Sequence, residues 1–475
     1  MARLAAALFL IALALPATAA AFGKTDQPIQ MGDGVKLATT YYVPDGAPPA
    51  GGWPALMLLH GLGGSRNAGS PLGMSLNAVA ETQLAPQGYA VLTFDARGHG
   101  QSEGVVSIDG PREIQDVREL FNWLAARPEI NAQHIGALGY SYGGGAILRA
   151  TVEGVPFAAI APAITWTDLY SALLPQDLAR SGVVLGFWES IAARAAPEVQ
   201  PIVNDTLAGR NLAGVHAFAS QRSTRSLLGT IKAPTLLMQG RRDFAFDVDQ
   251  ALAAYSRLKA PKRLYLGDFG HPPSANPPAE APHLLAEARQ WFDRYLKGLA
   301  NGIDRQPPVE IAPDPWTGRT FSYRSLPARK TLKLAFPGRK EIGSTGKVAR
   351  TLPRRKARLE TFGAPTLRVS LSSPNGWPHV VAVLSALTPD GREIVVSSGG
   401  ARVRLGSKRK EVAIRLISQV TNVPPRSRLR LTVAGTSTAQ SPGNLLYLSG
   451  VPRTARLVVG RAKLTLPVLA RPISR

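Results

Sequence analysis

The pentapeptide GYSYG at residues 139–143 places a serine, Ser141, between two glycines. In this G-x-S-x-G pattern the glycines permit a tight turn, which lifts the serine hydroxyl above a sheet at the start of the next helix. The apolar run at residues 135–138 predicts the strand before the turn, and residues 143–150 predict the helix after it. Because the pattern has the surroundings it needs, Ser141 is predicted to be a nucleophile.

A serine hydroxyl is a weak nucleophile at neutral pH, so it needs a general base. Of the seven histidines, His271, His283 and His379 follow both the serine and the apolar segments after it. His271 ends the glycine-rich sequence GDFGH directly after a predicted strand, whereas His283 lies beside leucines in a predicted helix and His379 lies in the basic last third. His271 is therefore the predicted base.

The third member of such a site is an acid between the serine and the histidine in the chain. Asp243 comes soon after the predicted strand at residues 235–238, and Asp247 lies four residues further on. A carboxylate here would fix the tautomer of His271 and stabilise its protonated form. Asp243 is favoured because it is nearer the end of the strand, and Asp247 is the alternative.

An oxyanion that forms during attack on a carbonyl needs two backbone N–H donors. One is predicted to be the N–H of Tyr142, the residue after the nucleophile, and the other the N–H of Leu62, in the HGLG loop at residues 60–63. His60 is expected to be structural. The polar turn that begins at Asp95 is expected to brace the loops of the site.

The segments that must position these residues alternate between strands and helices. The apolar runs predict strands covered on both faces, and residues 114–126 have the spacing of a helix. This alternation predicts a doubly wound, mostly parallel sheet with crossover helices. Residues 161–228 interrupt the rhythm and predict a helical cap, in which Trp166 and Trp188 could line an apolar acyl pocket.

The positive charge of the chain is concentrated in its last third. The net charge is +23, and residues 305–475 hold 31 Lys and Arg against 7 Asp and Glu. Their short alternating segments, separated by turns, predict an all-β sandwich. The predicted domains are therefore a catalytic domain at 22–304 and a basic sandwich at 305–475.

The N-terminal residues 1–21 predict a cleaved signal peptide. Arg3 is followed by about a dozen apolar residues, then Pro16 and the cleavage pattern ATA at 17–19. The apolar run is too short to span a bilayer. The protein is therefore expected to be exported to a periplasm or to the medium. It contains no cysteine, which excludes disulfides and thiolate metal sites.

Taken together, the chain resembles the cocaine-esterase and X-prolyl-dipeptidyl-peptidase group of serine hydrolases. The matching features are GYSYG, Asp243, the Gly270-His271 pair, the helix end at residues 291–298 and the β-sandwich after it. The resemblance implies an α/β-hydrolase fold with a helical cap and a C-terminal jelly-roll-like domain, and an active site between the three. Members of the group often use a tyrosine hydroxyl as an oxyanion donor, but the HGLG loop has no tyrosine.

The predicted activity is hydrolysis of carboxylic esters through an acyl-enzyme on Ser141, without a metal or a cofactor. The alternative is an X-prolyl dipeptidyl-peptidase or amidase, which must hold a free ammonium group, usually with paired carboxylates. The acidic residues of the cap include no adjacent pair. The expected substrate is thus a small ester, or else a short peptide.

A second alternative concerns the basic C-terminal domain, which could bind an anionic envelope surface. Its densest basic clusters are RRK at residues 354–356 and KRK at residues 408–410. Nucleic acid is not an expected partner, because no aromatic residues interleave with these charges.

Overall fold

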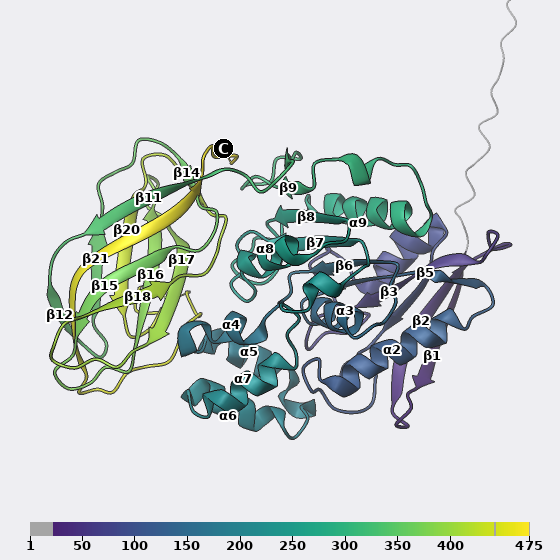
Figure 1. Ribbon diagram of the computed structural model, residues 1–475, viewed down its shortest axis with the longest axis horizontal. Helices are drawn as coiled ribbons and strands as arrows, with labels where there is room; N and C mark the ends of the chain where they lie inside the picture. Colours follow the sequence, from purple (N-terminus) through teal and green to yellow (C-terminus); the bar gives the residue numbers. More distant parts are fainter. Residues whose placement is uncertain (1–21, 441–442, 475) are drawn as a thin grey trace, which may run out of the picture.

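The computed structural model describes residues 22–440 and 443–474 (Figure 1). The predicted signal peptide at residues 1–21 lies outside the described residues. Within them, no helix is both long enough and apolar enough to cross a membrane.

A ten-stranded mixed sheet forms the centre of the catalytic domain, in the order β1-β2-β4-β3-β5-β6-β7-β8-β9-β10. Strands β4, β3 and β5 to β9 are parallel, whereas β1, β2 and β10 pair antiparallel with their neighbours. The strands are β1 (Phe22–Gln30), β2 (Lys36–Pro44), β3 (Trp53–Leu59), β4 (Ala90–Phe94), β5 (Ile130–Tyr140), β6 (Ala159–Ala163), β7 (Thr235–Gly240), β8 (Lys262–Gly267), β9 (Val309–Ile311) and β10 (Phe321–Tyr323).

Helices cover both faces of this sheet and explain why its central strands are apolar throughout. One face packs against α2 (Pro111–Ala125), α3 (Tyr142–Val152) and α8 (Val248–Arg257). The other packs against α1 (Leu76–Val79) and α9 (Ala281–Leu296), where Trp291 is fully buried.

A helical cap is inserted between β6 and β7. It contains α4 (Leu169–Leu173), α5 (Ser181–Ile191), α6 (Val199–Ala208) and α7 (Leu212–Ser220). The predicted start at residue 161 is slightly too early, because residues 161–163 still belong to β6. The sequence of β6, AIAPA, has one β-branched residue, Ile160, and contains a proline, which is why the pattern did not reveal it.

The C-terminal domain is a sandwich of two antiparallel sheets around one apolar core. One sheet has the order β11-β21-β15-β18, with β12 also paired to β21, and the other has the order β13-β20-β16-β17. The strands are β11 (Arg329–Phe336), β12 (Lys340–Gly343), β13 (Lys347–Thr351), β14 (Leu359–Glu360), β15 (Thr366–Ser372), β16 (His379–Leu387), β17 (Glu393–Arg402), β18 (Lys410–Arg415), β19 (Asn422–Val423), β20 (Arg428–Ala434) and β21 (Arg456–Leu469).

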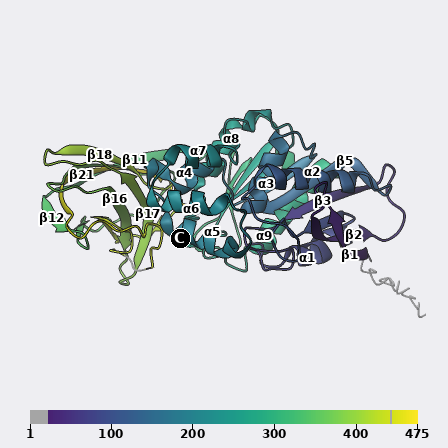
Figure 2. The ribbon, with the colours of Figure 1, turned by 90° about the horizontal axis from the view of Figure 1, so that it is seen from below.

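The sandwich packs against the catalytic domain and its cap. Val381 and Ile417 share an apolar cluster with Leu178 of the cap and Phe244 of the catalytic domain. Figure 2 shows β17 beside the cap helices and β12 at the far end of the molecule. The interface also holds a fully buried ion pair between Arg241 and Glu360.

The boundary predicted at residue 304 falls too early. β9 pairs with β8 and β10 pairs with β9, so residues up to 323 still belong to the catalytic sheet. The first sandwich strand begins at Arg329. The prediction followed the step in charge. It missed β9 and β10 because each has only three residues, too few to show in the sequence that the sheet continues past residue 304.

The predicted fold class is confirmed: an α/β-hydrolase sheet with a helical cap is followed by an all-β domain. The jelly-roll-like character of that domain stays a prediction.

Candidate active site

Ser141 lies on a strained turn between β5 and α3, with φ of 55° and ψ of −117°. Such a conformation costs free energy in a residue with a side chain, and it is characteristic of functional sites. The neighbouring glycines are sterically required. A Cβ on Gly143 would lie 2.4 Å from the carbonyl oxygen of Leu59, and one on Gly139 would lie 2.8 Å from the backbone of Gly143. The turn therefore needs the GYSYG pattern.

The structure brings Ser141, His271 and Asp243 together at the carboxyl ends of β5, β8 and β7. The Oγ of Ser141 lies 2.9 Å from Nε2 of His271. The other ring nitrogen of His271, Nδ1, lies 2.7 Å from Oδ2 of Asp243. These distances allow a proton to pass from the serine to the histidine while the carboxylate orients the ring.

Asp243 is fully buried and its carboxylate is held by four contacts. Oδ1 accepts hydrogen bonds from the backbone N–H groups of Ala245 and Phe246, both at 2.9 Å. Oδ2 accepts from the backbone N–H of His271 as well as from its ring. The alternative acid, Asp247, points elsewhere: its Oδ2 accepts from the N–H of Ser418 at 2.8 Å.

The two predicted oxyanion donors both border the cavity that contains Ser141. Tyr142 is the first residue of α3, so its N–H has no partner within the helix. In the part of the chain that the structure describes, neither this N–H nor that of Leu62 donates to a protein acceptor. Both groups are therefore available to a developing negative charge.

His60 holds the loops next to the site through hydrogen bonds to their backbone. Its Nε2 accepts a hydrogen bond from the N–H of Ala96, and its Nδ1 lies 2.7 Å from the carbonyl oxygen of Gly61. Nδ1 therefore carries the proton of a neutral ring. Burial lowers the pKa of His60 to about 4. Burial likewise lowers the pKa of His99, whose ring packs against that of His60, to about 4.

The two histidines that were set aside for the base lie away from Ser141. His283 bonds Glu310 at 2.9 Å, and His379 contacts backbone carbonyls inside the sandwich. His283, Glu287 and Glu310 are close enough to one another to suggest a cation site. Arg263 already bridges Glu287 and Glu310, at 2.7 and 2.6 Å, so this group is an ion network.

The turn at Asp95 braces the loops, as its geometry requires. Its Oδ1 accepts from the backbone N–H of Arg66 at 2.7 Å, and its Oδ2 accepts from the N–H of Gln101 at 2.9 Å. The Arg66 guanidinium also pairs with this carboxylate. Asp95 therefore ties the loop after β3 to the loop after β4.

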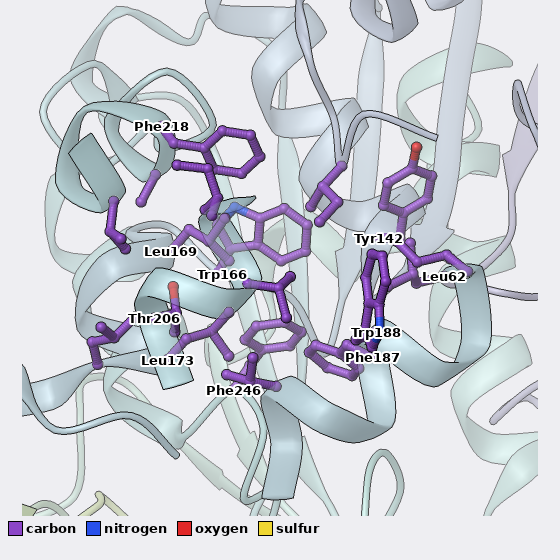
Figure 3. Close-up of a pocket in the computed structure, with 18 of the residues that line it drawn as sticks. Leu62, Tyr142, Trp166, Leu169, Leu173, Phe187, Trp188, Thr206, Phe218 and Phe246 are labelled. Carbon is purple, nitrogen blue, oxygen red and sulfur yellow. The ribbon is translucent and has the colours of Figure 1, made fainter. Parts of the chain in front are cut away.

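An apolar cavity of about 80 Å³ lies beside Ser141, beneath the cap. Figure 3 shows Trp166, Phe187, Trp188 and Phe246 gathered around it. Trp166 is buried, and its indole N–H donates to the carbonyl oxygen of Arg222 at 2.7 Å. Both tryptophans singled out in the sequence thus line the cavity.

Two aromatic residues of the site gave no signal in the sequence. The rings of Phe187 and Phe246 pack edge-on against the ring of His271, with centroids 5.9 and 5.3 Å away. Phe187 comes from the cap helix α5, and Phe246 from the loop of the acid. Their roles depend on how the cap folds over the sheet, which no local pattern encodes.

His271 lines a second, larger cleft of about 1010 Å³. It lies between the cap, the loop of His271 and the sandwich, and Phe187 borders both spaces. The triad therefore borders a small apolar cavity and a larger, more polar cleft.

A nucleophilic serine bonded to a histidine and a buried aspartate, at the strand ends of this sheet, defines a serine hydrolase of the α/β-hydrolase class. The sequence pattern of the X-Pro dipeptidyl-peptidase (S15) family matches residues 33–273. The chain belongs to this family.

Similar proteins agree with this placement. A Bacillus anthracis protein named "Putative Xaa-Pro dipeptidyl-peptidase" is 25% identical over 254 residues, which cover 48% of this chain and 41% of the relative. The chain thus spans well under two thirds of the relative that it matches. A CocE/NonD family hydrolase from Staphylococcus aureus has the same fold over 94% of both chains, with a TM-score of 0.73 and 17% identity. An α-amino acid ester hydrolase has the same fold over 97% of this chain and 98% of the other chain, with a TM-score of 0.66 and 16% identity.

Proposed function

We propose that this protein is an exported carboxylic-ester hydrolase that accepts esters of apolar acids. The observation that supports this activity is the lining of the cavity beside Ser141. Among the described residues that line it, none carries a charged side chain. A buried ammonium group without a partner is strongly disfavoured. This cavity therefore suits an apolar acyl chain better than the N-terminus of a peptide.

The mechanism follows from the positions of the chain's own groups. His271 Nε2 removes the proton from Ser141 Oγ as the oxygen bonds to the acyl carbon, and the N–H groups of Leu62 and Tyr142 receive the oxyanion. His271 then gives the proton to the departing oxygen, which leaves an acyl-enzyme. Water activated by the same nitrogen hydrolyses that ester, the acid is released, and Ser141 regains its proton.

The decisive test compares p-nitrophenyl esters of increasing acyl length with alanyl-prolyl p-nitroanilide. We expect ester cleavage by the wild type and a loss of about 10⁴-fold or more in Ser141→Ala. Cleavage of the anilide with a higher kcat/KM than any ester would contradict the proposal. It would favour the second candidate, an X-prolyl dipeptidyl-peptidase, which membership of the S15 family supports.

We also propose that residues 1–21 are a signal peptide, on the pattern of an apolar run followed by ATA. N-terminal sequencing of the protein from the periplasmic or medium fraction should give a chain that begins between residues 20 and 22. A chain that retains Met1 and stays in the cytoplasm would contradict export.

For the sandwich we propose binding to an anionic envelope surface. The supporting observation is the outer face of the β11-β21-β15-β18 sheet, where Lys463 stands opposite Arg368 and Lys333 shares a row with Arg415. All four cations are exposed. Arg368 pairs with Glu411 at 3.1 Å and Arg415 pairs with Asp249, whereas Lys333 and Lys463 have no ion pair among the described residues. Such a face attracts anionic lipid over about a Debye length.

The test is co-sedimentation with vesicles that contain phosphatidylglycerol, with vesicles of neutral lipid as the control. Binding should weaken with salt and in a Lys333→Gln/Lys463→Gln variant. Equal binding to both kinds of vesicle, or binding that salt does not change, would contradict this role.

A further inference from the structure

The leaving group of the substrate must lie on the histidine side of the triad. His271 donates its proton to the departing oxygen, so that oxygen is near Nε2 when the bond breaks. The small apolar cavity is bordered by Ser141 and by the two oxyanion donors, whereas the larger cleft is bordered by His271. The acyl part therefore occupies the cavity, and the leaving group occupies the cleft.

The cleft differs from the cavity in the charges that line it. Its charged lining residues, apart from His271, are Arg242, Asp314, Arg358, Arg392 and Glu393. Arg392 pairs with Asp390 at 2.7 Å, and Glu393 is 3.4 Å from Arg430. These two residues are thus neutralised by neighbours.

Arg242 and Arg358 remain without an ion pair among the described residues. Arg242 precedes the acid Asp243, is half-buried, and its Nε atom is shielded from solvent with no hydrogen-bond partner. Arg358 is also half-buried and donates only to the amide oxygen of Asn422, at 2.7 Å. Asp314 is the single carboxylate of the lining that no described cation pairs with, so a positive charge is left over.

We propose that this cleft selects leaving groups that carry an oxyanion, such as a carboxylate, and that Arg242 and Arg358 bind it. A guanidinium offers paired N–H donors that match a carboxylate or a sulfonate. The low polarity of the acyl cavity and the positive charge of the cleft together define the substrate: an ester of an apolar acid with an anionic alcohol or phenol. This inference rests on the proposed esterase activity and deepens it.

The test uses four hexanoate esters that share one acyl group. Their leaving groups are 3-carboxyphenol, 3-sulfophenol, the neutral 3-carbamoylphenol and the cationic 3-(trimethylammonio)phenol. The wild type should have a higher kcat/KM for both anionic esters than for the carbamoyl ester, and added salt should reduce the difference. A preference for the carboxylate ester alone would show that the cleft recognises a carboxylate and not a sulfonate.

Variants locate the preference. Arg242→Gln and Arg358→Gln should each lower the ratio of kcat/KM for the anionic esters to kcat/KM for the neutral ester by about 5-fold. This loss lies between those expected for an exposed ion pair and for a buried charge-assisted hydrogen bond. Arg242→Lys, which keeps the charge, should restore much of the ratio. Arg392→Gln, which alters an arginine already paired with Asp390, should leave the ratio near that of the wild type.

Two results would overturn the inference: a ratio that does not change in Arg242→Gln and Arg358→Gln, or a preference for the cationic ester, in which case Asp314 would dominate the cleft. If none of the four esters is cleaved in a serine-dependent way, the esterase proposal itself fails. These failures are distinguishable, because only the last one removes turnover of the neutral ester.

Discussion

The side-chain amide of Gln419, in the sandwich domain, donates a hydrogen bond of 2.9 Å to the backbone carbonyl oxygen of Asp243, the acid of the triad. The contact is buried on both sides. Around it, the N–H of Val248 donates to the backbone carbonyl oxygen of Ser418, and the N–H of Val420 donates to that of Arg241. A segment of the C-terminal domain therefore holds the loop that carries Asp243, so the sandwich is part of the support of the active site.

Gln419 is expected to be a positioning residue. Gln419→Leu removes the bond to Asp243 and should lower kcat by about 10-fold, because small displacements of a triad lower the rate steeply. KM for a short ester should change little, since Gln419 does not line the acyl cavity. Ser373→Ala, which removes a partly buried hydrogen bond to the backbone carbonyl oxygen of Arg456 within the sandwich, is the matched control and should keep kcat. A fall in thermal stability with an unchanged kcat would show that Gln419 only stabilises the fold.

Substitution of the two candidate acids, Asp243 and Asp247, should lower kcat to very different extents. Asp243→Asn keeps the size of the side chain but favours the wrong tautomer of His271, so kcat should fall by about 10⁴-fold. Asp247→Asn changes an acid that faces Ser418, and it should lower kcat by less than about 10-fold. Steady-state kinetics on one p-nitrophenyl ester measures both. Similar losses in the two variants would contradict the assignment of Asp243.

The cavity should set the length of the acyl chain. Ala219 is buried in its wall, on α7, and Ala219→Phe should fill the space and shift the preferred ester towards shorter acids. Ala217→Phe adds the same ring to the exposed side of the same helix and serves as the control. The measurement is kcat/KM across acetate to decanoate esters. An unchanged profile in Ala219→Phe would mean that the acyl chain binds elsewhere.

Local patterns in the sequence carried much of the fold and of the site. The GYSYG turn needs glycine at fixed positions, so its sequence predicts the geometry of Ser141. Strands buried on both faces are continuous apolar runs, which made β3, β4 and β7 visible. By contrast, β6 is rich in alanine and β9 is only three residues long, and neither has a pattern of its own.

The parts of the site that could not be predicted depend on contacts between distant segments. Phe187 packs against His271 because the cap folds over the sheet, and Gln419 reaches Asp243 because the sandwich docks beside it. The paired and unpaired arginines of the cleft likewise differ only in what surrounds them. A sequence shows the residue types at such positions, and the assembled domains determine what they contact.

The buried ring of His60 predicts how stability depends on pH. Burial lowers the pKa of His60 in the folded protein to about 4, from an ordinary value of 6.5. Between these values the unfolded chain binds the proton more readily, so the free energy of unfolding should fall as the pH drops from 6.5 to 4. The contribution of His60 to that fall is about 3 kcal/mol. Protonation would also remove the acceptor for the N–H of Ala96.

Urea unfolding of the Ser141→Ala protein at pH 7.5, 5.5 and 4.5 measures this dependence without turnover. His60→Gln, whose amide oxygen can still accept from Ala96, should be less stable than its parent at pH 7.5 but should lose less stability on acidification. His134→Gln, at an exposed position, should follow its parent at every pH. The buried His99 is expected to leave part of the slope in place, since burial also lowers its pKa to about 4. An identical slope in His60→Gln and in its parent would mean that the ring of His60 does not stay neutral within the fold.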